Sequence, residues 1–208
     1  METSASSDRF TIRALSSETW PAFAALVERH GGIFGGCWCT WFHTVAKDKD
    51  RTYDSNRDLK CRLVDEGRAH AALVFDGGEA VAWAEYGPPD ELPNIHHRKE
   101  YDETSAAAPD FRVTCIFVDR RYRRHGLAAL ALQGALDQIA AAGGGVVEGY
   151  PHDLTTHPPT KKMSSSFLYN GTRRMYEEAG FTYDRPKGQK NCVMVRTVTA
   201  RPAGVGGP

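Results

Sequence analysis

Apolar and polar residues follow two different periods along the chain. Short runs that alternate or stay apolar, the pattern of strands, cover residues 9–13, 69–75, 80–86, 112–118, 146–150, 181–185 and 191–197. Longer runs with apolar residues three or four positions apart, the pattern of helices, cover residues 20–29, 58–66, 124–142 and 167–179. Strands and helices in this order predict an α/β or α+β fold with a mixed sheet.

Turn-forming residues mark the boundaries between these runs. Asp76-Gly77-Gly78 separates two strand-like runs and predicts a hairpin. Ser16 or Ser17 is placed to cap the first helix. Two polar stretches, residues 90–110 and 151–166, are long for loops of a compact domain, and loops of that length are usually functional or mobile.

Charge and length limit the possible classes of protein. The chain has 208 residues with 26 basic and 26 acidic side chains, so its formal net charge is zero. That balance gives no reason to expect nucleic acid or an anionic membrane as a partner. No apolar run approaches the roughly 20 residues that a membrane span needs. We expect one domain over residues 9–198, with a disordered N-terminus at 1–8 and a flexible tail at 199–208.

Cysteine usage indicates a reducing compartment. The chain has five cysteines, an odd number, and its first residues lack the basic and apolar regions of a secretory signal. Both observations predict reduced thiols and a cytoplasmic location.

The segment Arg123-Arg124-His125-Gly126-Leu127-Ala128 carries the clearest chemical signal. It lies between an apolar strand and an Ala/Leu-rich helix. The first amides of a helix have no partner within the helix, and the helix dipole adds positive charge there, so this turn is suited to bind a pyrophosphate. Gly126 permits close approach of a ligand, and the two arginines can bind phosphate oxygens. A basic surface turn without a ligand is the alternative.

Read as Arg-x-x-Gly-x-Ala, residues 123–128 resemble the acyl-CoA pyrophosphate loop of the GNAT (Gcn5-related) N-acetyltransferases. Tyr176-Glu-Glu-Ala-Gly-Phe181 resembles the Tyr-x-x-x-Gly-Phe motif of the same family. Many members place an Asn seven residues before that Tyr, whereas this chain has Tyr169 there, followed by Asn170. The resemblance implies a GNAT-like acyl-CoA N-acyltransferase fold, a central mixed sheet with two splayed strands, flanked by helices.

The resemblance also implies acetyl-CoA as the cosubstrate and a set of residues that bind it. The end of the strand at 112–118 would run beside the pantetheine arm, and the turn would hold the diphosphate. The expected cofactor-binding residues are Ile116, Phe117, Val118, Arg123, Arg124, His125, Gly126, Leu127, Ala128 and Asn170.

Acetyl transfer to an amine needs an acid for the departing thiolate and, for a charged amine, a base. Tyr176 is the candidate acid, because a phenol can donate to a thiolate; a packed core tyrosine is the alternative. Glu148 and Glu85 are candidate bases, because a carboxylate in the middle of a strand is costly unless it has a partner or a role. His152, His157 or water could replace them.

The segment Gly36-Cys-Trp-Cys-Thr-Trp-Phe-His43 is rich in aromatic and thiol groups. Cys37, Cys39 and His43, with Cys61 as a fourth, could bind a soft metal, but Cys-x-Cys is not the usual zinc spacing and we predict no metal. By the resemblance, this region lies beside the acceptor pocket. Its aromatic side chains could form a wall for an amine. The expected substrate-binding residues are Trp38, Trp41, Phe42 and Trp83.

Together these observations predict an enzyme that transfers an acetyl group from acetyl-CoA to the primary amine of a small molecule, by direct attack in a ternary complex. An acetyltransferase for a peptide or protein amine and a non-catalytic acyl-CoA-binding module are the alternatives. The sequence is compatible with a homodimer but leaves the oligomeric state and the acceptor open.

Overall fold

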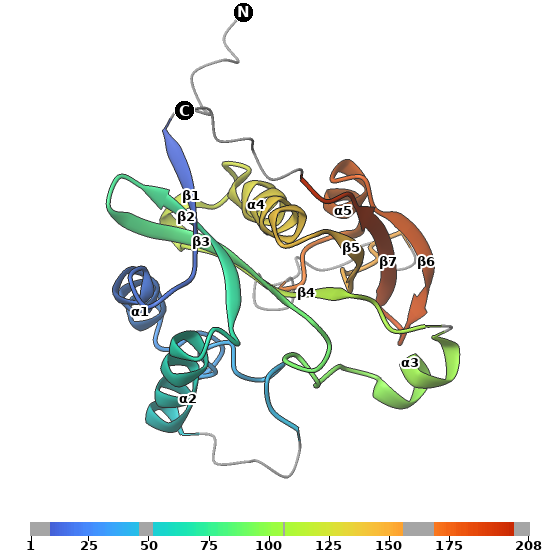
Figure 1. The fold of residues 1–208 in the computed structure, drawn as a ribbon, viewed down its shortest axis with the longest axis horizontal. Coiled ribbons are helices and arrows are strands. Elements are labelled where there is room, and N and C mark those ends of the chain that lie inside the picture. The colour runs from blue at the N-terminus through green and yellow to red at the C-terminus, as the bar shows by residue number, and fades with distance from the viewer. Residues whose placement is uncertain (1–8, 46–51, 106, 156–168, 202–208) are drawn as a thin grey trace, which may run out of the picture.

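A computed structural model describes residues 9–45, 52–105, 107–155 and 169–201 of the chain. These residues form one seven-stranded mixed sheet with the strand order β1-β2-β3-β4-β5-β7-β6 (Figure 1). The strands are β1 (Phe10–Ala14), β2 (His70–Asp76), β3 (Glu79–Gly87), β4 (Phe111–Val118), β5 (Gly145–Gly149), β6 (Thr182–Lys187) and β7 (Asn191–Val198). The helices are α1 (Trp20–Arg29), α2 (Tyr53–Asp65), α3 (Arg98–Thr104), α4 (Leu127–Ala141) and α5 (Arg173–Glu178). Both the mixed sheet and the flanking helices match the predicted fold class.

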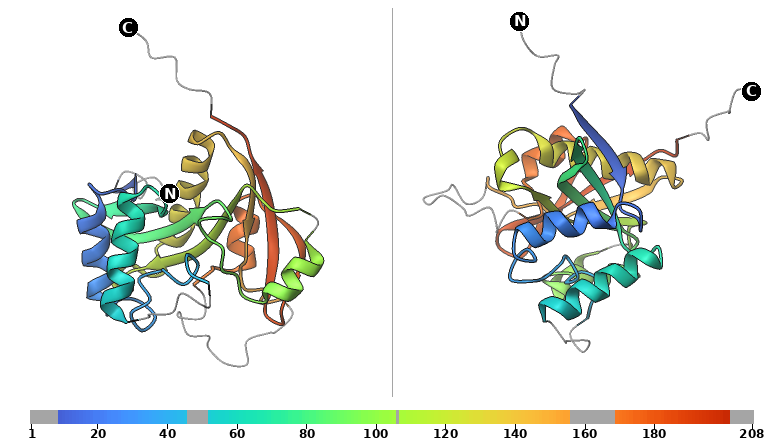
Figure 2. Two further views of the ribbon diagram at one scale, coloured as in Figure 1. Left: turned by 60° about the horizontal axis from the view of Figure 1, so that its bottom comes forward. Right: turned by 90° about the vertical axis from the view of Figure 1, so that its left-hand side faces the viewer.

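Helices cover the sheet on both faces, and each covered face holds its own apolar core. The stripe on α4 that includes Ala131, Ala135 and Ile139 packs against β2, β3 and β4 on one face. Helices α1 and α2 lie next to each other on the opposite face (Figure 2), where Phe23 and Leu26 of α1 belong to the second core. Burial of these side chains is the main driving force for the fold.

Most boundaries follow the predicted runs, with four differences, one of which is that α5 begins at Arg173 rather than near residue 167. Thr19, not Ser16 or Ser17, is the N-cap residue of α1. Helix α2 begins five residues earlier than predicted, because the Thr52 side chain accepts a hydrogen bond from the Ser55 amide and caps it. The polar stretch at 90–110 contains the short helix α3, which the sequence pattern does not predict.

Strand β4 has an irregularity that shapes the centre of the sheet. Glu85 of β3 pairs with Cys115 and Tyr86 pairs with Val113, so Thr114 is an extra residue and forms a β-bulge. Beyond Val113, β4 no longer pairs with β5, since their parallel pairing covers only residues 111–113 and 147–149. The two strands separate from this point onward.

Some predictions concern residues outside the described ranges. These are the disordered N-terminus at 1–8, most of the tail at 199–208, His157 and most of the loop at 151–166, and the first two residues of the helix at 167–179. Within the described ranges, none of the helices has the length and apolar character needed to cross a bilayer.

Candidate functional site

A cavity of about 340 Å³ lies where β4 ends and α4 begins; we call it the turn cavity. Eight of the ten residues predicted to bind acyl-CoA line it: Ile116, Phe117, Val118, Arg123, Arg124, Gly126, Leu127 and Ala128. Phe34, Tyr122 and Gly171, which the sequence did not single out, complete the lining.

The backbone of the turn fits a diphosphate. Gly126 is the N-cap of α4 and has φ of 77°, the left-handed region that glycine adopts without strain. A Cβ at this position would meet nothing within 4 Å, so the space beside it is open. Arg123 and Arg124 are exposed and form no ion pair with the described residues. The amides at the start of α4 and these two cations therefore face an open cavity without competing partners.

The other two predicted carrier residues lie outside the turn cavity. His125 lines a separate hollow beside Arg9 and Arg121. Asn170 is buried, and its amide nitrogen donates to the Tyr150 carbonyl at 3.1 Å. Neither contributes to the lining that the structure gives to the turn cavity.

One backbone donor of β4 is already occupied. The Ile116 amide donates to the Tyr169 carbonyl at 2.6 Å, in the region where β4 and β5 have separated. A pantetheine arm that paired with β4 at Ile116 would have to displace this carbonyl.

A second cavity of about 380 Å³ adjoins the first; we call it the aromatic cavity. Phe34 lines both cavities, and the consecutive β4 residues Cys115 and Ile116 line one each. The remaining lining of the aromatic cavity comes from Gly35, Cys37, Cys39, Thr40, Trp41, Phe42, Thr44, Asn56, His96 and Tyr169.

Two of the four aromatic residues predicted to bind the substrate line this cavity. They are Trp41 and Phe42. Trp38 and Trp83 are fully buried and do not line it. Trp83 stacks on Phe117 with ring centroids 4.7 Å apart, so its role in the structure is core packing.

His96, in the loop before α3, is a further wall residue of the aromatic cavity. Its ring stacks on Trp41 with centroids 3.8 Å apart and an interplanar angle of 15°. His96 is exposed on its outer side, but partial burial of its ring, with the charges of Lys187 and His97, lowers its pKa to about 4. The imidazole is therefore neutral at neutral pH.

Tyr176 lines neither cavity and lies fully buried in the core, beside the point where β4 and β5 separate. Gly149 at the end of β5 leaves room for its ring, since a Cβ there would collide with Tyr176 Cε1. Its hydroxyl has no hydrogen-bond partner among the described residues. Burial raises the pKa of this phenol far above its usual value, with smaller contributions from Cys115 and Cys192, so it stays protonated.

Glu85 is the centre of a buried polar network behind the aromatic cavity. Its Oε1 lies 2.5 Å from Lys60 Nζ and 3.3 Å from His43 Nε2, and its Oε2 accepts from the Thr114 hydroxyl at 2.7 Å. Although burial opposes ionisation, the Lys60 charge and the His43 and Lys60 hydrogen bonds lower the pKa of Glu85 to about 2. Glu85 is thus a fixed anion and a poor proton acceptor at neutral pH.

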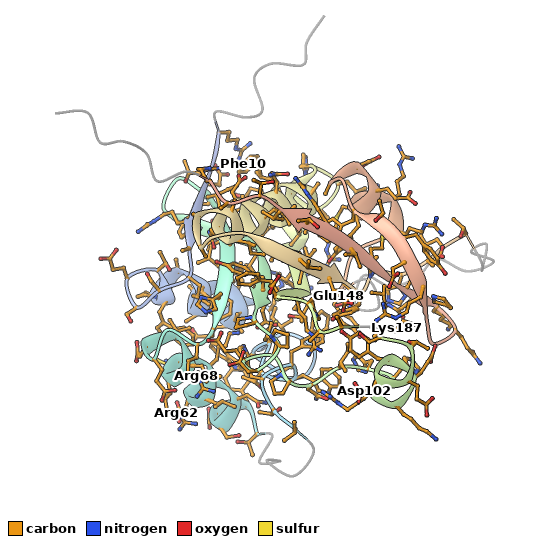
Figure 3. All side chains as sticks on the ribbon, turned by 45° about the vertical axis from the view of Figure 1, so that its right-hand side comes forward. Phe10, Arg62, Arg68, Asp102, Glu148 and Lys187 are labelled. Carbon is orange, nitrogen blue, oxygen red and sulfur yellow. The ribbon has the colours of Figure 1, made fainter. Side chains whose placement is uncertain are left out.

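Glu148 belongs to a second buried network on the side of α3 (Figure 3). Its Oε2 accepts from the Tyr101 hydroxyl at 2.6 Å and from the Tyr150 hydroxyl at 2.8 Å. Its Oε1 lies 3.5 Å from Arg185 NH2. Like Glu85, this carboxylate does not line either cavity.

The cysteines are not arranged as a metal site within the described ranges, where no group of three or more His, Cys, Asp or Glu side chains could hold an ion. Cys39 and Cys115 instead approach each other, with Sγ atoms 3.0 Å apart in the wall of the aromatic cavity. Cys61 lies elsewhere, on α2 near Asp65. All five cysteines are free thiols.

Comparison with known proteins identifies the domain. The model of the acetyltransferase (GNAT) family matches residues 20–152. No curated protein matches the chain. Among solved structures, a GNAT-family protein from Desulfovibrio desulfuricans is 17% identical, with a TM-score of 0.51 over 91% of this chain and 99% of that one.

Two further solved structures are similar at a lower level. A GNAT-family acetyltransferase from Streptococcus pneumoniae is 13% identical, with a TM-score of 0.49 over 91% of this chain and 99% of that one. The protein yncA from Salmonella typhimurium, solved with its cofactor acetyl-CoA, is 13% identical, with a TM-score of 0.49 over 94% of this chain and 97% of that one.

Proposed function

Since the chain belongs to the GNAT family of acetyltransferases, and is therefore an N-acetyltransferase that uses acetyl-CoA, we propose that it acetylates the primary amine of a small molecule. The observation that carries this proposal is the junction of the two cavities. They share Phe34 and meet at Cys115 and Ile116 of β4. A carrier bound in the turn cavity along β4 would end where the aromatic cavity begins.

The turn residues would hold the carrier. Acetyl-CoA supplies an acetyl group activated as a thioester. The first amides of α4, with Arg123 and Arg124, would bind the diphosphate by charge-assisted hydrogen bonds. Gly126 would let the backbone approach the phosphate oxygens closely. These groups bind and orient but take no part in bond breaking.

Tyr176 would act as the general acid. A buried hydroxyl without a partner costs free energy, on the order of 1–3 kcal/mol, which an acceptor placed beside it would recover. The raised pKa keeps the phenol protonated until a strongly basic group, such as a departing thiolate, arrives. Its position beside the gap between β4 and β5 supports this role.

Glu85, as a fixed anion, and Glu148, held by two tyrosine hydroxyls, would support the site rather than act as bases. Each accepts hydrogen bonds from at least two groups, and neither faces a cavity. The aromatic cavity would bind the acceptor. Its volume of about 380 Å³ suits a small molecule better than a polypeptide, for which an open groove is expected.

Two measurements test the proposal. Isothermal calorimetry with acetyl-CoA and with CoA is expected to show binding of both. Thiol release from acetyl-CoA over a panel of small amines and short peptides is expected to be stimulated by at least one small amine. Absence of CoA binding by folded protein would rule out the enzyme, and binding without transfer to any amine would indicate a non-catalytic module.

A further inference from the structure

The described wall of the aromatic cavity consists of apolar and uncharged polar side chains. No charged side chain of the described ranges lines it. Its polar groups are the thiols of Cys37, Cys39 and Cys115, two threonine hydroxyls, the Asn56 amide, the Tyr169 phenol and the neutral His96 imidazole. Burial raises the pKa values of Cys37 and Tyr169, to about 11 and about 12, so these groups are uncharged at neutral pH as well.

The charges closest behind the wall are unavailable to a cationic substrate. Glu85 is close to the cysteine side, since it pairs with Cys115 across β3 and β4 and its charge raises the pKa values of Cys37 and Cys39. Its own oxygens are held by Lys60, His43 and Thr114. The pair of Glu85 and Lys60 therefore contributes almost no net charge to the cavity.

On the His96 side, the charged group that acts most strongly on the imidazole is a lysine. Lys187 is buried and is close enough to His96 to lower the pKa of that imidazole. Burial, with the charge of Arg112, lowers the pKa of Lys187 to about 8, although the carboxylates of Glu100 and Glu148 act in the opposite direction. An ammonium ion in the aromatic cavity would thus lose hydration without gaining a counter-ion from the lining residues that the structure describes.

We propose that the acceptor is an aryl amine, bound with its ring against the stacked rings of Trp41 and His96. This inference rests on the proposed function, since it assigns the acceptor of that reaction. An aryl nitrogen shares its lone pair with the ring and is uncharged at neutral pH, whereas an alkyl amine with a pKa of about 10 is almost wholly protonated. The neutral amine needs neither a counter-ion nor a base to become a nucleophile.

The transfer step then balances without an enzyme base. The aryl nitrogen attacks the acetyl carbon, a C–N bond forms and the C–S bond breaks. The nitrogen releases one proton to water, and the departing sulfur takes one proton from Tyr176, which water restores. The products are the N-acetylated aryl amine and free CoA.

The isomers para-toluidine and benzylamine provide a matched test, because they have the same atoms but differ in whether the nitrogen is attached to the ring. Calorimetry without acetyl-CoA is expected to show that para-toluidine binds at least about tenfold more tightly at neutral pH. Benzylamine affinity is expected to rise about tenfold per pH unit toward the pKa of its amine, because only the neutral form enters. Para-toluidine affinity is expected to stay constant over that range.

A gain of function sharpens the test. Thr44 lines the aromatic cavity, and Thr44→Asp would place a carboxylate in it. This variant is expected to bind benzylamine at neutral pH about tenfold more tightly, while para-toluidine affinity changes little. Trp41→Leu, and Phe42→Leu if that variant does not fold, should weaken para-toluidine binding, whereas Tyr183→Leu on the exposed surface of β6 should not.

The outcomes separate this inference from the proposed function. If wild-type protein binds benzylamine as tightly as para-toluidine with no pH dependence, or acetylates benzylamine but not para-toluidine, the aryl amine assignment is wrong and the proposed function stands. If acetyl-CoA binds but no amine is acetylated, the proposed function fails, and aryl amine binding alone does not restore it.

Discussion

The two cavities are built in opposite ways. The turn cavity takes most of its lining from one continuous stretch of chain, and its key groups are backbone amides and Gly126. The aromatic cavity takes side chains from the loop at 34–44, from α2, from the loop before α3, from β4 and from Tyr169. Carrier binding is thus a local property of a strand-turn-helix unit, whereas the acceptor site depends on how distant segments pack.

The largest effect is expected when the buried ion pair of Lys60 and Glu85, which lies behind the aromatic cavity, is removed. Lys60→Met leaves Glu85 ionised and buried without its cation, which should lower the free energy of unfolding by about 3–5 kcal/mol. Urea denaturation measures this loss. Where the variant remains folded, calorimetry should show nearly unchanged acetyl-CoA affinity, because Lys60 lies outside the turn cavity.

Lys99→Met provides the control for a lysine substitution. Its side chain is 90% exposed and its distance to Glu103 is 3.9 Å, so the loss should stay within about 0.5 kcal/mol. Equal stability of Lys60→Met and Lys99→Met would mean that the buried pair does not hold the cavity wall together.

Lowering the pH protonates Glu85 and so removes the same buried ion pair with Lys60. The pKa of Glu85 is lowered from 4.5 to about 2, so its contribution to stability is complete above pH 4.5 and is lost as the pH falls toward 2. The loss should amount to about 3 kcal/mol. Thermal melts between these pH values should therefore show a steeper decline for wild-type protein than for the double variant Lys60→Met, Glu85→Met. Parallel declines would assign the acid sensitivity to other carboxylates, such as Asp119, whose pKa is also lowered.

A substitution of Tyr176 tests the gap between β4 and β5, beside which its ring lies. Tyr176→Phe should lower kcat about tenfold or more by removing the proton donor, with little change in acetyl-CoA affinity. Because the hydroxyl has no partner among the described residues, the variant should be as stable as wild type. Steady-state kinetics and melting curves check both expectations, with Tyr183→Phe as an exposed control. Unchanged kcat would remove Tyr176 from the mechanism.

The smallest expected effect concerns the turn cavity and comes from a substitution of Gly126. Gly126→Ala and Gly67→Ala both place a Cβ on a left-handed residue with open space around it, and each should cost about 1–2 kcal/mol of stability. Only Gly126→Ala should weaken acetyl-CoA binding, on the order of tenfold, because only Gly126 lines the turn cavity. Equal acetyl-CoA affinities of the two variants would argue against close approach at Gly126.

The sequence predicts well those features whose cause is local. The hairpin at residues 76–78 depends on its glycines, and the pattern indicates both its strands. Helix α3 escapes prediction because it is short and polar, with Tyr101 as its buried residue. The cap of α1 is missed because three neighbouring hydroxyl residues can serve equally well by pattern, and packing places Thr19 at the helix start.

The same reasoning explains what the sequence reveals of the site. The turn residues are contiguous, so a motif is enough to find them. Lys60 lies in a polar helix and has the pattern of a surface lysine, so its buried pairing with Glu85 becomes evident only when β3 packs beside α2. His96 similarly joins the wall through Trp41, 55 positions away by residue number, since no local signal links the two.

The extra residue in β4 determines which side chains the two halves of that strand present to each face of the sheet. Because of Thr114, Val113 and Ile116 share the face of α4 although they are three positions apart, while Cys115 and Phe117 face α1. Deleting this single residue would turn the side chains of one half of the strand to the opposite faces of the sheet. Either the segment from Phe111 to Val113 or the segment from Cys115 to Val118 would then exchange faces, and in the second case Cys115 and Ile116 would trade places at the junction of the cavities.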